Sequence, residues 1–288
     1  MDMKNKDNML IPGQRIRPPG NKQKVLQLLE ELYGLKTLSI SELNAYDDRN
    51  YHVICEETHM NPHITIISKY GYVLKIVNSL DSQKTHVIEA QTEMLIFLHQ
   101  QAYNHHKTLW MLNSVPQLHQ FIYAIKNVFE RELAHEVIIA FEKDVLQITS
   151  QLEQGMIHGD LNEQNLVINS NGKEIFAVID FGDAHRTCLI FELAIALCYM
   201  ILQTGDIAMG KYVIEGYQDI RKLTDLEKKI LKISVCARIC QSLIMGAYSY
   251  LHDPQNEYLL TTQKGWSLLK KLWPLAQDDV LRNWGLIN

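Results

Sequence analysis

The chain has 288 residues, of which 47% are hydrophobic and 21% charged, and its formal net charge is −5. This length and balance are typical of a soluble globular protein with one large domain or two smaller lobes. Neither half carries a concentrated run of basic residues, which argues against a nucleic-acid partner.

Cysteine usage and the first residues bear on the compartment. The five cysteines, at positions 55, 188, 198, 236 and 240, match neither a disulfide framework nor zinc-ligand spacing, which favours buried free thiols. The first residues lack the apolar segment of a signal peptide, and no stretch approaches the ~20 apolar residues of a membrane span. We therefore expect a reduced, soluble, cytoplasmic protein with no membrane partner.

The first part of the chain predicts a helix followed by short antiparallel strands. Residues 21–34 place leucines at helical spacing and end in a glycine. From about 36 to 77 the β-branched runs are TLSISEL, NYHVICEE, ITIISK and GYVLKIV, separated by Asp, Asn, Pro and Gly. Residues 84–100 predict a helix, and residues 107–153 predict two more.

The second part predicts one hairpin within a helical region. The strand-like runs NLVIN and IFAVIDF flank Asn171-Gly172, a strong hairpin signal. After about residue 189 the pattern is helical, and Thr224 with Glu227 forms a capping-box signature. The fold class is therefore α+β, with an N-terminal arm and β-rich nucleotide-binding lobe at 1–104 and a helical catalytic and substrate lobe at 105–288.

Several polar residues stand between apolar runs beside the predicted hairpin. IHGDLNEQNLVI carries His158, Asp160 and Asn165, and Asp180 ends the run FAVID. A hairpin would bring its two open ends together, so two carboxylates and one amide oxygen would converge on a site suited to Mg²⁺. Phosphoryl transfer needs such a metal, together with a carboxylate that orients and deprotonates the attacking hydroxyl.

The order H-x-D-x-x-x-x-N followed by D-F-G resembles the catalytic signatures of kinases. Gly159, in place of the arginine of protein kinases, resembles the aminoglycoside phosphotransferase and choline kinase superfamily, which implies a protein-kinase-like fold. Segments from about 40 to 270, among them AYDDRNYHV, EAQTEMLIFL and CARICQSLIMGAYS, resemble the hydroxylysine kinase family. That resemblance implies GTP (or ATP) as donor, 5-hydroxy-L-lysine as acceptor, and Mg²⁺.

The resemblance also implies roles for individual residues. Asp160 would be the catalytic base, and Asn165 and Asp180 would hold Mg²⁺. Lys75, in YVLKIV, would contact the nucleotide phosphates. An ordinary strand lysine that reaches solvent is the alternative if Lys75 is considered alone.

Further nucleotide contacts are expected on the predicted helix and at the first strand turn. Glu89 is the candidate ion-pair partner of Lys75, with Glu93 the next choice. The turn YDDRN, at positions 46–50, has no glycine. If this turn covers phosphates, it must therefore use side chains such as Arg49 and Asn50.

Four further polar residues could either contact the substrate or a metal, or have a structural role. Asp183 and Glu192 could contact a substrate amine, or serve as a helix-start carboxylate and a structural pair. Arg238, in an apolar helical stretch, could bind a substrate carboxylate, although a structural salt bridge is slightly favoured. His158 is expected to be a packed structural histidine rather than a metal ligand.

One segment of the family pattern is missing. The predicted helix ends near Gln100, and QAYNHH leads straight into a helical segment, with no room for the two strands and hinge that hold the purine. We therefore expect weakened or absent nucleotide affinity. A kinase for choline, ethanolamine, homoserine or an aminoglycoside, or an inactive pseudokinase, are alternatives; a protein kinase is disfavoured because no A-P-E segment follows DFG.

Overall fold

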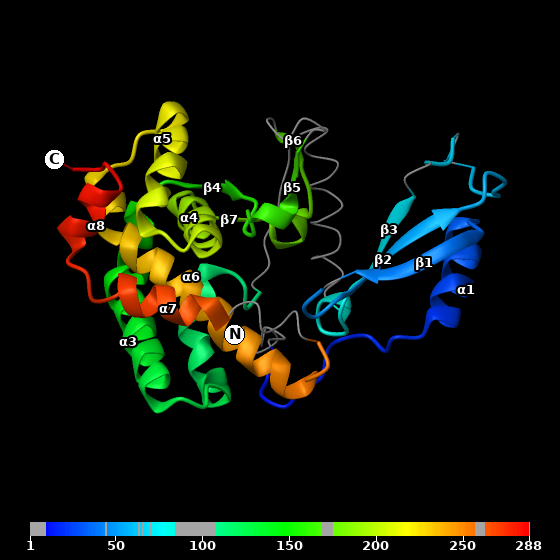
Figure 1. Ribbon diagram of the computed structural model, residues 1–288, viewed down its shortest axis with the longest axis horizontal. Coiled ribbons are helices and arrows are strands. Elements are labelled where there is room, and N and C mark those ends of the chain that lie inside the picture. Colours follow the sequence, from blue (N-terminus) through cyan, green and yellow to red (C-terminus); the bar gives the residue numbers. More distant parts are fainter. Residues whose placement is uncertain are drawn as a thin grey trace, which may run out of the picture. The chain divides into compact units, whose positions relative to one another are not determined.

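A computed structural model describes residues 10–43, 45–62, 64, 66–68, 71–83, 108–168, 175–256 and 263–287. The chain divides into two compact units, one spanning Gly13–Thr85 and the other Met1–Pro12 with His86–Asn288 (Figure 1). The predicted boundary at 104/105, the predicted helix at 84–100 with Glu89 and Glu93, and the Asn171-Gly172 turn all lie outside the described residues.

The smaller unit contains one helix and a three-stranded antiparallel sheet in the order β1-β2-β3. Its elements are α1 (Lys22–Tyr33), β1 (Thr37–Leu43), β2 (Arg49–Cys55), β3 (Tyr72–Ile76) and the short 3-10 helix η1 (Asp81–Gln83). The Asn21 side chain caps α1 by accepting from the Lys24 N–H, and Gly34 ends the helix at φ +63°. The predicted strand at 64–69 does not form in its described part, where Ile64 and Ile67 instead pack on the core.

The two faces of the sheet have different environments. Tyr51, Val53 and Cys55 alternate along β2 and are buried in one cluster with Val25 and Leu29 of α1. Because successive side chains of a strand point to opposite faces, the even-numbered positions of β2 lie on the face away from this cluster. This second face carries Asn50, with Lys75 opposite it on β3, beside apolar side chains such as Val73.

The larger unit is built around the long helix α6, which packs against η2, α3, α4 and α7. Its helices are η2 (Leu112–Ala124), α3 (Val128–Asp144), η3 (Leu146–Gln151), η4 (Glu163–Asn165), η5 (Phe181–Asp183), α4 (Ile190–Thr204), η6 (Ile207–Met209), α5 (Gly210–Ile220), α6 (Asp225–His252), α7 (Lys264–Leu272) and α8 (Gln277–Asn283). The predicted capping box of Thr224 and Glu227 is confirmed at the start of α6. The first helix predicted within 107–153 is a 3-10 helix that contains Pro116.

Helix α6 is long and apolar enough to cross a membrane, but 89% of its most apolar window is buried inside the protein. Its apolar character is therefore explained by its position in the core. All five cysteines are free and buried, as predicted, and burial raises the pKa of both Cys198 and Cys236 to about 12. Thiols with such pKa values are inert at neutral pH.

Two small antiparallel pairs of strands adjoin the helices. β5 (Leu166–Ile168) pairs with β6 (Ile175–Val178), which confirms the predicted hairpin. β4 (Gln154–Ile157) pairs with β7 (His185–Cys188), a pair that the sequence did not predict. β4 and β7 are only four residues long, and the whole β5–β6 hairpin lies between them in the sequence. No short turn therefore signals that they pair.

Candidate active site

The open end of the β5–β6 hairpin brings Asn165 and Asp180 into neighbouring positions. Leu166 is paired with Val178, and the Ile179 N–H donates to the Asn165 carbonyl at 3.0 Å. This bond extends the pairing by one step, so Asp180 leaves the strand beside Asn165. The backbone of the two hairpin ends therefore lies side by side, as the hairpin pattern predicts.

Asp160 lies in the loop that precedes this hairpin, with its side chain 27% exposed. Its Oδ2 accepts from the Asn162 side-chain amide at 2.9 Å and from that of Asn165 at 3.2 Å. The Asn165 amide also donates to the Asp160 carbonyl at 2.8 Å. With the nitrogen of its amide turned toward Asp160, Asn165 has its amide oxygen available for a cation.

Asn162 has a local role that the sequence interpretation missed. Its Oδ1 accepts from the backbone N–H groups of Gln164 and Asn165 and so caps the short helix η4. An asparagine two residues after Asp160 is the signal that could have predicted this cap.

Asp180 has φ +60° and ψ +67°, and no other non-glycine residue in the described part of the chain has a positive φ. Its carboxylate accepts from the Gly182 N–H at 3.4 Å. A left-handed backbone conformation is uncommon for a residue with a side chain and is concentrated at functional sites. The position of the Asp180 carboxylate is therefore set by a strained backbone conformation.

His158 connects the loop to the hairpin, as a structural histidine should. Its side chain is buried, and Nε2 lies 2.9 Å from the Ile179 carbonyl while Nδ1 accepts from the Asp160 N–H at 3.3 Å. The ring also packs on Phe181 at 4.7 Å between centroids. Because both ring nitrogens are engaged with the backbone, His158 is not placed to bind a metal.

Glu192, in the first turn of α4, holds the backbone of the same loop. One carboxylate oxygen accepts from the His158 N–H and lies 3.4 Å from the Gly159 nitrogen. Desolvation raises the pKa of Glu192, and the hydrogen bond from the His158 backbone partly opposes that shift. Of the two roles considered for Glu192, this contact favours the structural one.

Gly159 is required by close packing. It has φ +83°, and a Cβ atom at this position would lie 2.4 Å from the Asp183 carbonyl oxygen. The same carbonyl lies 2.6 Å from His185 Nδ1. An arginine at position 159, as in protein kinases, would clash with the Asp183 carbonyl. The main chain of Asp183 therefore packs directly against the loop that carries Asp160.

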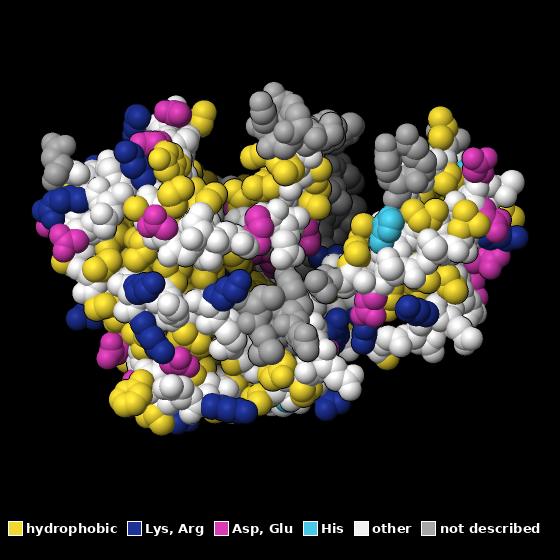
Figure 2. Space-filling view, viewed as in Figure 1, with side chains coloured by type: hydrophobic (Ala, Val, Ile, Leu, Met, Phe, Trp, Pro, Cys, Tyr) yellow, Lys and Arg dark blue, Asp and Glu magenta, His cyan; other side chains and the backbone are white. Residues whose placement is uncertain are grey.

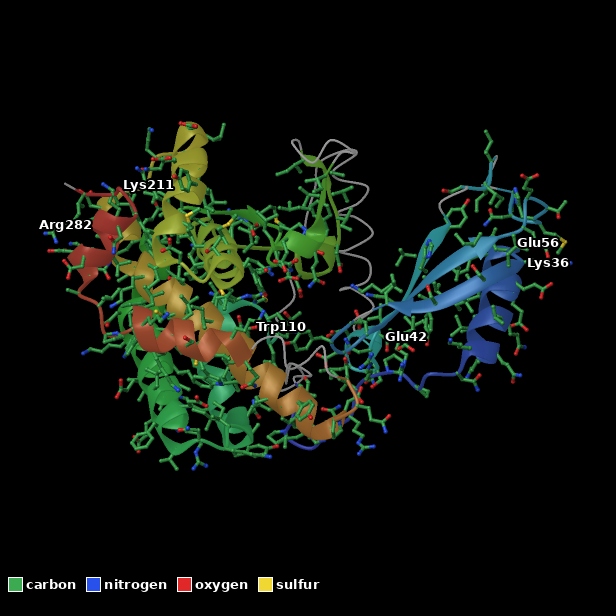
Figure 3. All side chains as sticks on the ribbon, viewed as in Figure 1. Lys36, Glu42, Glu56, Trp110, Lys211 and Arg282 are labelled. Carbon is green, nitrogen blue, oxygen red and sulfur yellow. The ribbon has the colours of Figure 1, made fainter. Side chains whose placement is uncertain are left out.

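Arg238 lies beside Asp160 and is 1% exposed. One Nη donates to Asp160 Oδ1 at 2.8 Å and to the Tyr199 hydroxyl at 2.9 Å. The other donates to the carbonyl of Trp110, which Figure 3 labels, and to Gln241. Desolvation alone would lower the pKa of Arg238, but its electrostatic interactions with Tyr199 and Asp160 outweigh this effect, and the pKa is raised. The guanidinium thus contacts the candidate base.

In the smaller unit, Lys75 and Asn50 are directly opposite each other on β3 and β2 and therefore share one face of the sheet. Lys75 is 3.3 Å from Asp48, whose other oxygen accepts from the Asn78 backbone and side chain. Asp48 was not predicted, although its position in YDDRN is the signal that could have found it. The predicted partner Glu89 lies outside the described residues.

Arg49 lies on the opposite face from Asn50. Its Nε donates to the Pro18 carbonyl at 2.6 Å, and its guanidinium is paired with Glu42. These contacts tie β2 to the preceding segment and to β1. Of the two side chains expected to reach phosphates, only Asn50 shares the face of Lys75.

Asp47, beside Asp48 in the same turn, is a strongly perturbed carboxyl group. The pKa of Asp47 is raised to about 7, mainly by burial and then by the charges of Asp48 and Asp81, whereas Arg17 opposes the rise. The turn therefore carries one carboxylate committed to Lys75 and a second that holds its proton near neutral pH.

The donor set around Asp180 fits a hard divalent cation. Asp180 supplies a carboxylate and Asn165 an amide oxygen, both suited to Mg²⁺. Among the described residues, no group of three or more His, Cys, Asp or Glu side chains could hold a metal alone. A cation here would thus need further oxygens from phosphates or water, as is usual for Mg²⁺ in phosphoryl-transfer sites.

The β5–β6 hairpin also exposes apolar side chains. Figure 2 shows hydrophobic side chains over this hairpin. The members with 37–61% exposure are Val167, Ile168, Ile175, Val178 and Ile179. The carboxylates at the open end of the hairpin are therefore bordered by an apolar surface.

Comparison with known proteins identifies relatives of the chain. Residues 71–226 match the phosphotransferase enzyme family (APH). Hydroxylysine kinase of Bos taurus is 26% identical over 354 aligned positions, covering 93% of both chains. Hydroxylysine kinase of Mus musculus is 28% identical, covering 89% of this chain and 90% of that protein. Because the first alignment is longer than the 288 residues of this chain, the Bos taurus kinase carries residues without a counterpart here.

Solved structures confirm the predicted fold class. A microcompartment-associated aminopropanol kinase has a TM-score of 0.62 at 14% identity, covering 91% of this chain and 100% of that one. An amicoumacin kinase, in complex with AMP-PNP and Ca²⁺, has a TM-score of 0.54 at 16% identity, covering 91% and 97%. The family match covers more than half of the chain, and this protein therefore belongs to the phosphotransferase enzyme family as a small-molecule kinase with a protein-kinase-like fold.

Proposed function

We propose that this protein transfers the γ-phosphoryl group of GTP, or of ATP, to the hydroxyl group of 5-hydroxy-L-lysine. The observation that carries this proposal is the hydrogen bond from the Asn165 amide to the Asp160 carboxylate at the open end of a hairpin, where the backbone of Ile179, just before Asp180, pairs with Asn165. The substrate is suggested by the hydroxylysine kinases that match along about nine tenths of the chain, and GTP by the family resemblance of the sequence motifs. The reducing cytoplasm, where buried free cysteines are stable, is the proposed location.

In the proposed mechanism, Asp160 accepts the proton of the substrate hydroxyl as its oxygen attacks the γ-phosphorus. Asn165 and Asp180 would hold Mg²⁺, which supplies charge neutralisation to the phosphates. Lys75 would contact the phosphates, with Asp48 positioning its ammonium and Asn50 beside it. Glu89 is kept as a second partner of Lys75, and Asp183 as a contact for the substrate amine.

The two lobes proposed for this reaction are residues 1–104 for the nucleotide and 105–288 for the base, the metal and the substrate. A binding protein with little turnover is the second candidate. The relatives carry residues that this chain lacks, and the described sheet of the smaller unit has three strands. Loss of residues from the nucleotide lobe would weaken binding of the base without disturbing the Asp160 loop.

A panel of acceptors tests the proposal. We expect phosphate transfer from GTP to 5-hydroxy-L-lysine with Mg²⁺, and much less to choline, ethanolamine, homoserine or an aminoglycoside. Asp180→Asn is expected to raise the Mg²⁺ concentration for half-maximal rate at least about tenfold, because it removes the only charged ligand proposed for the cation. Asp206→Asn, on an exposed turn, is the matched control. Tight GTP binding by calorimetry without transfer to any acceptor would favour the binding protein.

A further inference from the structure

The contact between Arg238 and Asp160 joins a fully buried cation to the proposed base. Arg238 comes from the middle of α6, whereas Asp160 lies in the loop between β4 and η4. The donor–acceptor distance of 2.8 Å is that of a charge-assisted hydrogen bond. A hydrogen bond of this kind, from a rigid core helix to a partly exposed carboxylate, restricts how the carboxylate can turn.

The guanidinium is itself fixed from several sides. Trp110 and Tyr199 place their rings 5.3 and 5.4 Å from the Arg238 Cζ atom, within cation–π range. Gln241, one turn further along α6, accepts from the guanidinium and donates to the Leu109 carbonyl. Arg238 is thus held by the core independently of Asp160.

The four Nη donors of Arg238 are used by protein acceptors, and its Nε is buried with no acceptor among the described residues. A substrate carboxylate could reach the guanidinium only by displacing Asp160, Tyr199 or another of these acceptors. The flanking rings also cover the planar group. Of the two roles that the sequence offered for Arg238, the geometry therefore disfavours binding of a substrate carboxylate and favours the salt bridge, here with Asp160.

The remaining acceptor capacity of Asp160 indicates where the proton goes. An ionised carboxylate offers about four acceptor positions, two on each oxygen. Asn162 and Asn165 occupy those of Oδ2, and Arg238 occupies one on Oδ1. One position on Oδ1 is then left among the described contacts, on the oxygen that Arg238 fixes.

We propose that Arg238 is a positioning residue that fixes Asp160 Oδ1 as the atom that receives the proton of the substrate hydroxyl. This inference rests on the proposed function. As the hydroxyl oxygen bonds to the γ-phosphorus and the bond to the nucleoside diphosphate breaks, the hydroxyl proton moves to Oδ1. The specificity for an amino-acid carboxylate then comes from groups other than Arg238.

Two acceptors that differ only in the carboxylate test this role. They are 5-hydroxy-L-lysine and the hydroxy-diamine formed by replacing its carboxylate with hydrogen. Arg238→Gln is expected to lower kcat about 10- to 100-fold with both acceptors, with less than about a threefold change in KM, because a misplaced reacting group costs rate rather than affinity. Arg238→Lys keeps the charge and should recover part of the loss. A rise in KM confined to the acceptor with the carboxylate would overturn the inference.

Tyr199→Phe is the matched control, since it removes one acceptor of the same guanidinium and leaves the bond to Asp160 intact. It should destabilise the protein while changing kcat less than about threefold. An equal fall in kcat for Tyr199→Phe and Arg238→Gln would show a structural effect only and would contradict the positioning role.

Urea unfolding of Asp160→Asn, Arg238→Gln and the double variant gives a readout that does not need turnover. Each single variant should raise the unfolding equilibrium constant. If Arg238 and Asp160 stabilise each other, the fold-increase for the double variant should be at least about tenfold smaller than the product of the two single fold-increases. Additive effects overturn the inference even if no acceptor is phosphorylated. An inactive wild-type protein with strong coupling would count against the proposed function but support the fixed carboxylate.

Discussion

The Asp160 loop and the Lys75 strand differ in how many separate elements hold their functional side chains. The loop is bonded to α6 through Arg238, to α4 through Glu192, and through His158 to Ile179, the residue that follows β6. Lys75 lies in a short strand, 34% exposed, and its ion pair with Asp48 is formed within the small unit itself. The proposed base is therefore fixed by the core of the larger unit, whereas the proposed phosphate contact depends on a small sheet.

Because the two sets of side chains belong to different units, the catalytic step and the affinity for the nucleotide can be affected independently. The geometry around Asp160 belongs to one unit and should persist whatever is missing from the other. The relatives contain residues without a counterpart in this chain. If those residues complete the nucleotide lobe, the loss should appear as weak nucleotide binding rather than as disorder of the base.

The largest effect is expected for Asp160→Asn. Loss of a general base lowers kcat by about 10²- to 10⁴-fold, and the change should be seen in a phosphate-transfer assay at saturating acceptor. Because Arg238 loses its countercharge, circular dichroism should verify that the variant is folded at the assay temperature. Glu163→Gln, three residues away and exposed, is the control and should keep its activity. Equal rates for both variants would mean that Asp160 is not the base.

Gly159→Ala tests how tightly the loop is packed. The new Cβ would meet the Asp183 carbonyl at 2.4 Å and would also force a left-handed backbone on alanine. We expect the free energy of unfolding to fall by about 3 kcal/mol, from strain and overpacking together. Urea denaturation measures this change.

Gly205→Ala separates the two causes. Gly205 has φ +69°, but nothing lies within 4 Å of a Cβ added there. Its substitution should therefore show the backbone strain alone, about 1 kcal/mol. Similar losses for the two glycines would show that the Asp160 loop yields easily and would weaken the contrast between the two regions.

Lys75→Met and Arg49→Met compare the two faces of the small sheet. Lys75 shares its face with Asn50, whereas Arg49 is bonded to Pro18 and Glu42 on the other. Lys75→Met should raise the Kd for GTP about tenfold, because it removes a charge from the proposed phosphate contact. Arg49→Met should leave that Kd within about threefold of the wild-type value. Isothermal titration in the presence of Mg²⁺ distinguishes the two outcomes.

The sequence predicted local features better than distant ones. The helix at 21–34, the hairpin strands and the cap at Thr224 rest on signals from neighbouring residues, and each was found. The β4–β7 pair was missed because its two strands are short and separated by the whole hairpin. The first helix predicted within 107–153 is of the 3-10 type and contains Pro116, and the sequence did not distinguish this type from an α-helix although proline removes one backbone donor.

The candidate site shows the same division. Asn165 and Asp180 were expected to lie together because a hairpin pairs its two ends, and the backbone of Ile179, just before Asp180, does pair with Asn165. The contact between Arg238 and Asp160 spans 78 positions and required knowledge of how α6 packs. Similarly, Arg49 and Asn50 looked equivalent in the turn YDDRN, and only the register of β2 showed that they face opposite ways.

The titration of Asp47 should change stability less than Gly159→Ala does. Its pKa is raised from 3.8 to about 7 in the folded protein, so the folded state holds a proton that the unfolded state releases above about pH 4. The stability that this group contributes is therefore fully present below about pH 4 and is lost as the pH rises through about 7. For a partly exposed carboxyl group the loss is on the order of 2 kcal/mol.

Urea unfolding of Asp47→Asn between pH 4 and pH 8 measures this contribution. The wild-type protein should lose stability relative to the variant as the pH rises, because the amide at position 47 cannot ionise. Asp219→Asn, on an exposed helical surface, should follow the wild-type curve. Parallel curves for the wild type and Asp47→Asn would show that this carboxyl group ionises equally in both states. The turn beside Lys75 would then carry a second full negative charge near neutral pH, which would oppose the binding of phosphates there and sharpen the contrast with the well-compensated charges around Asp160.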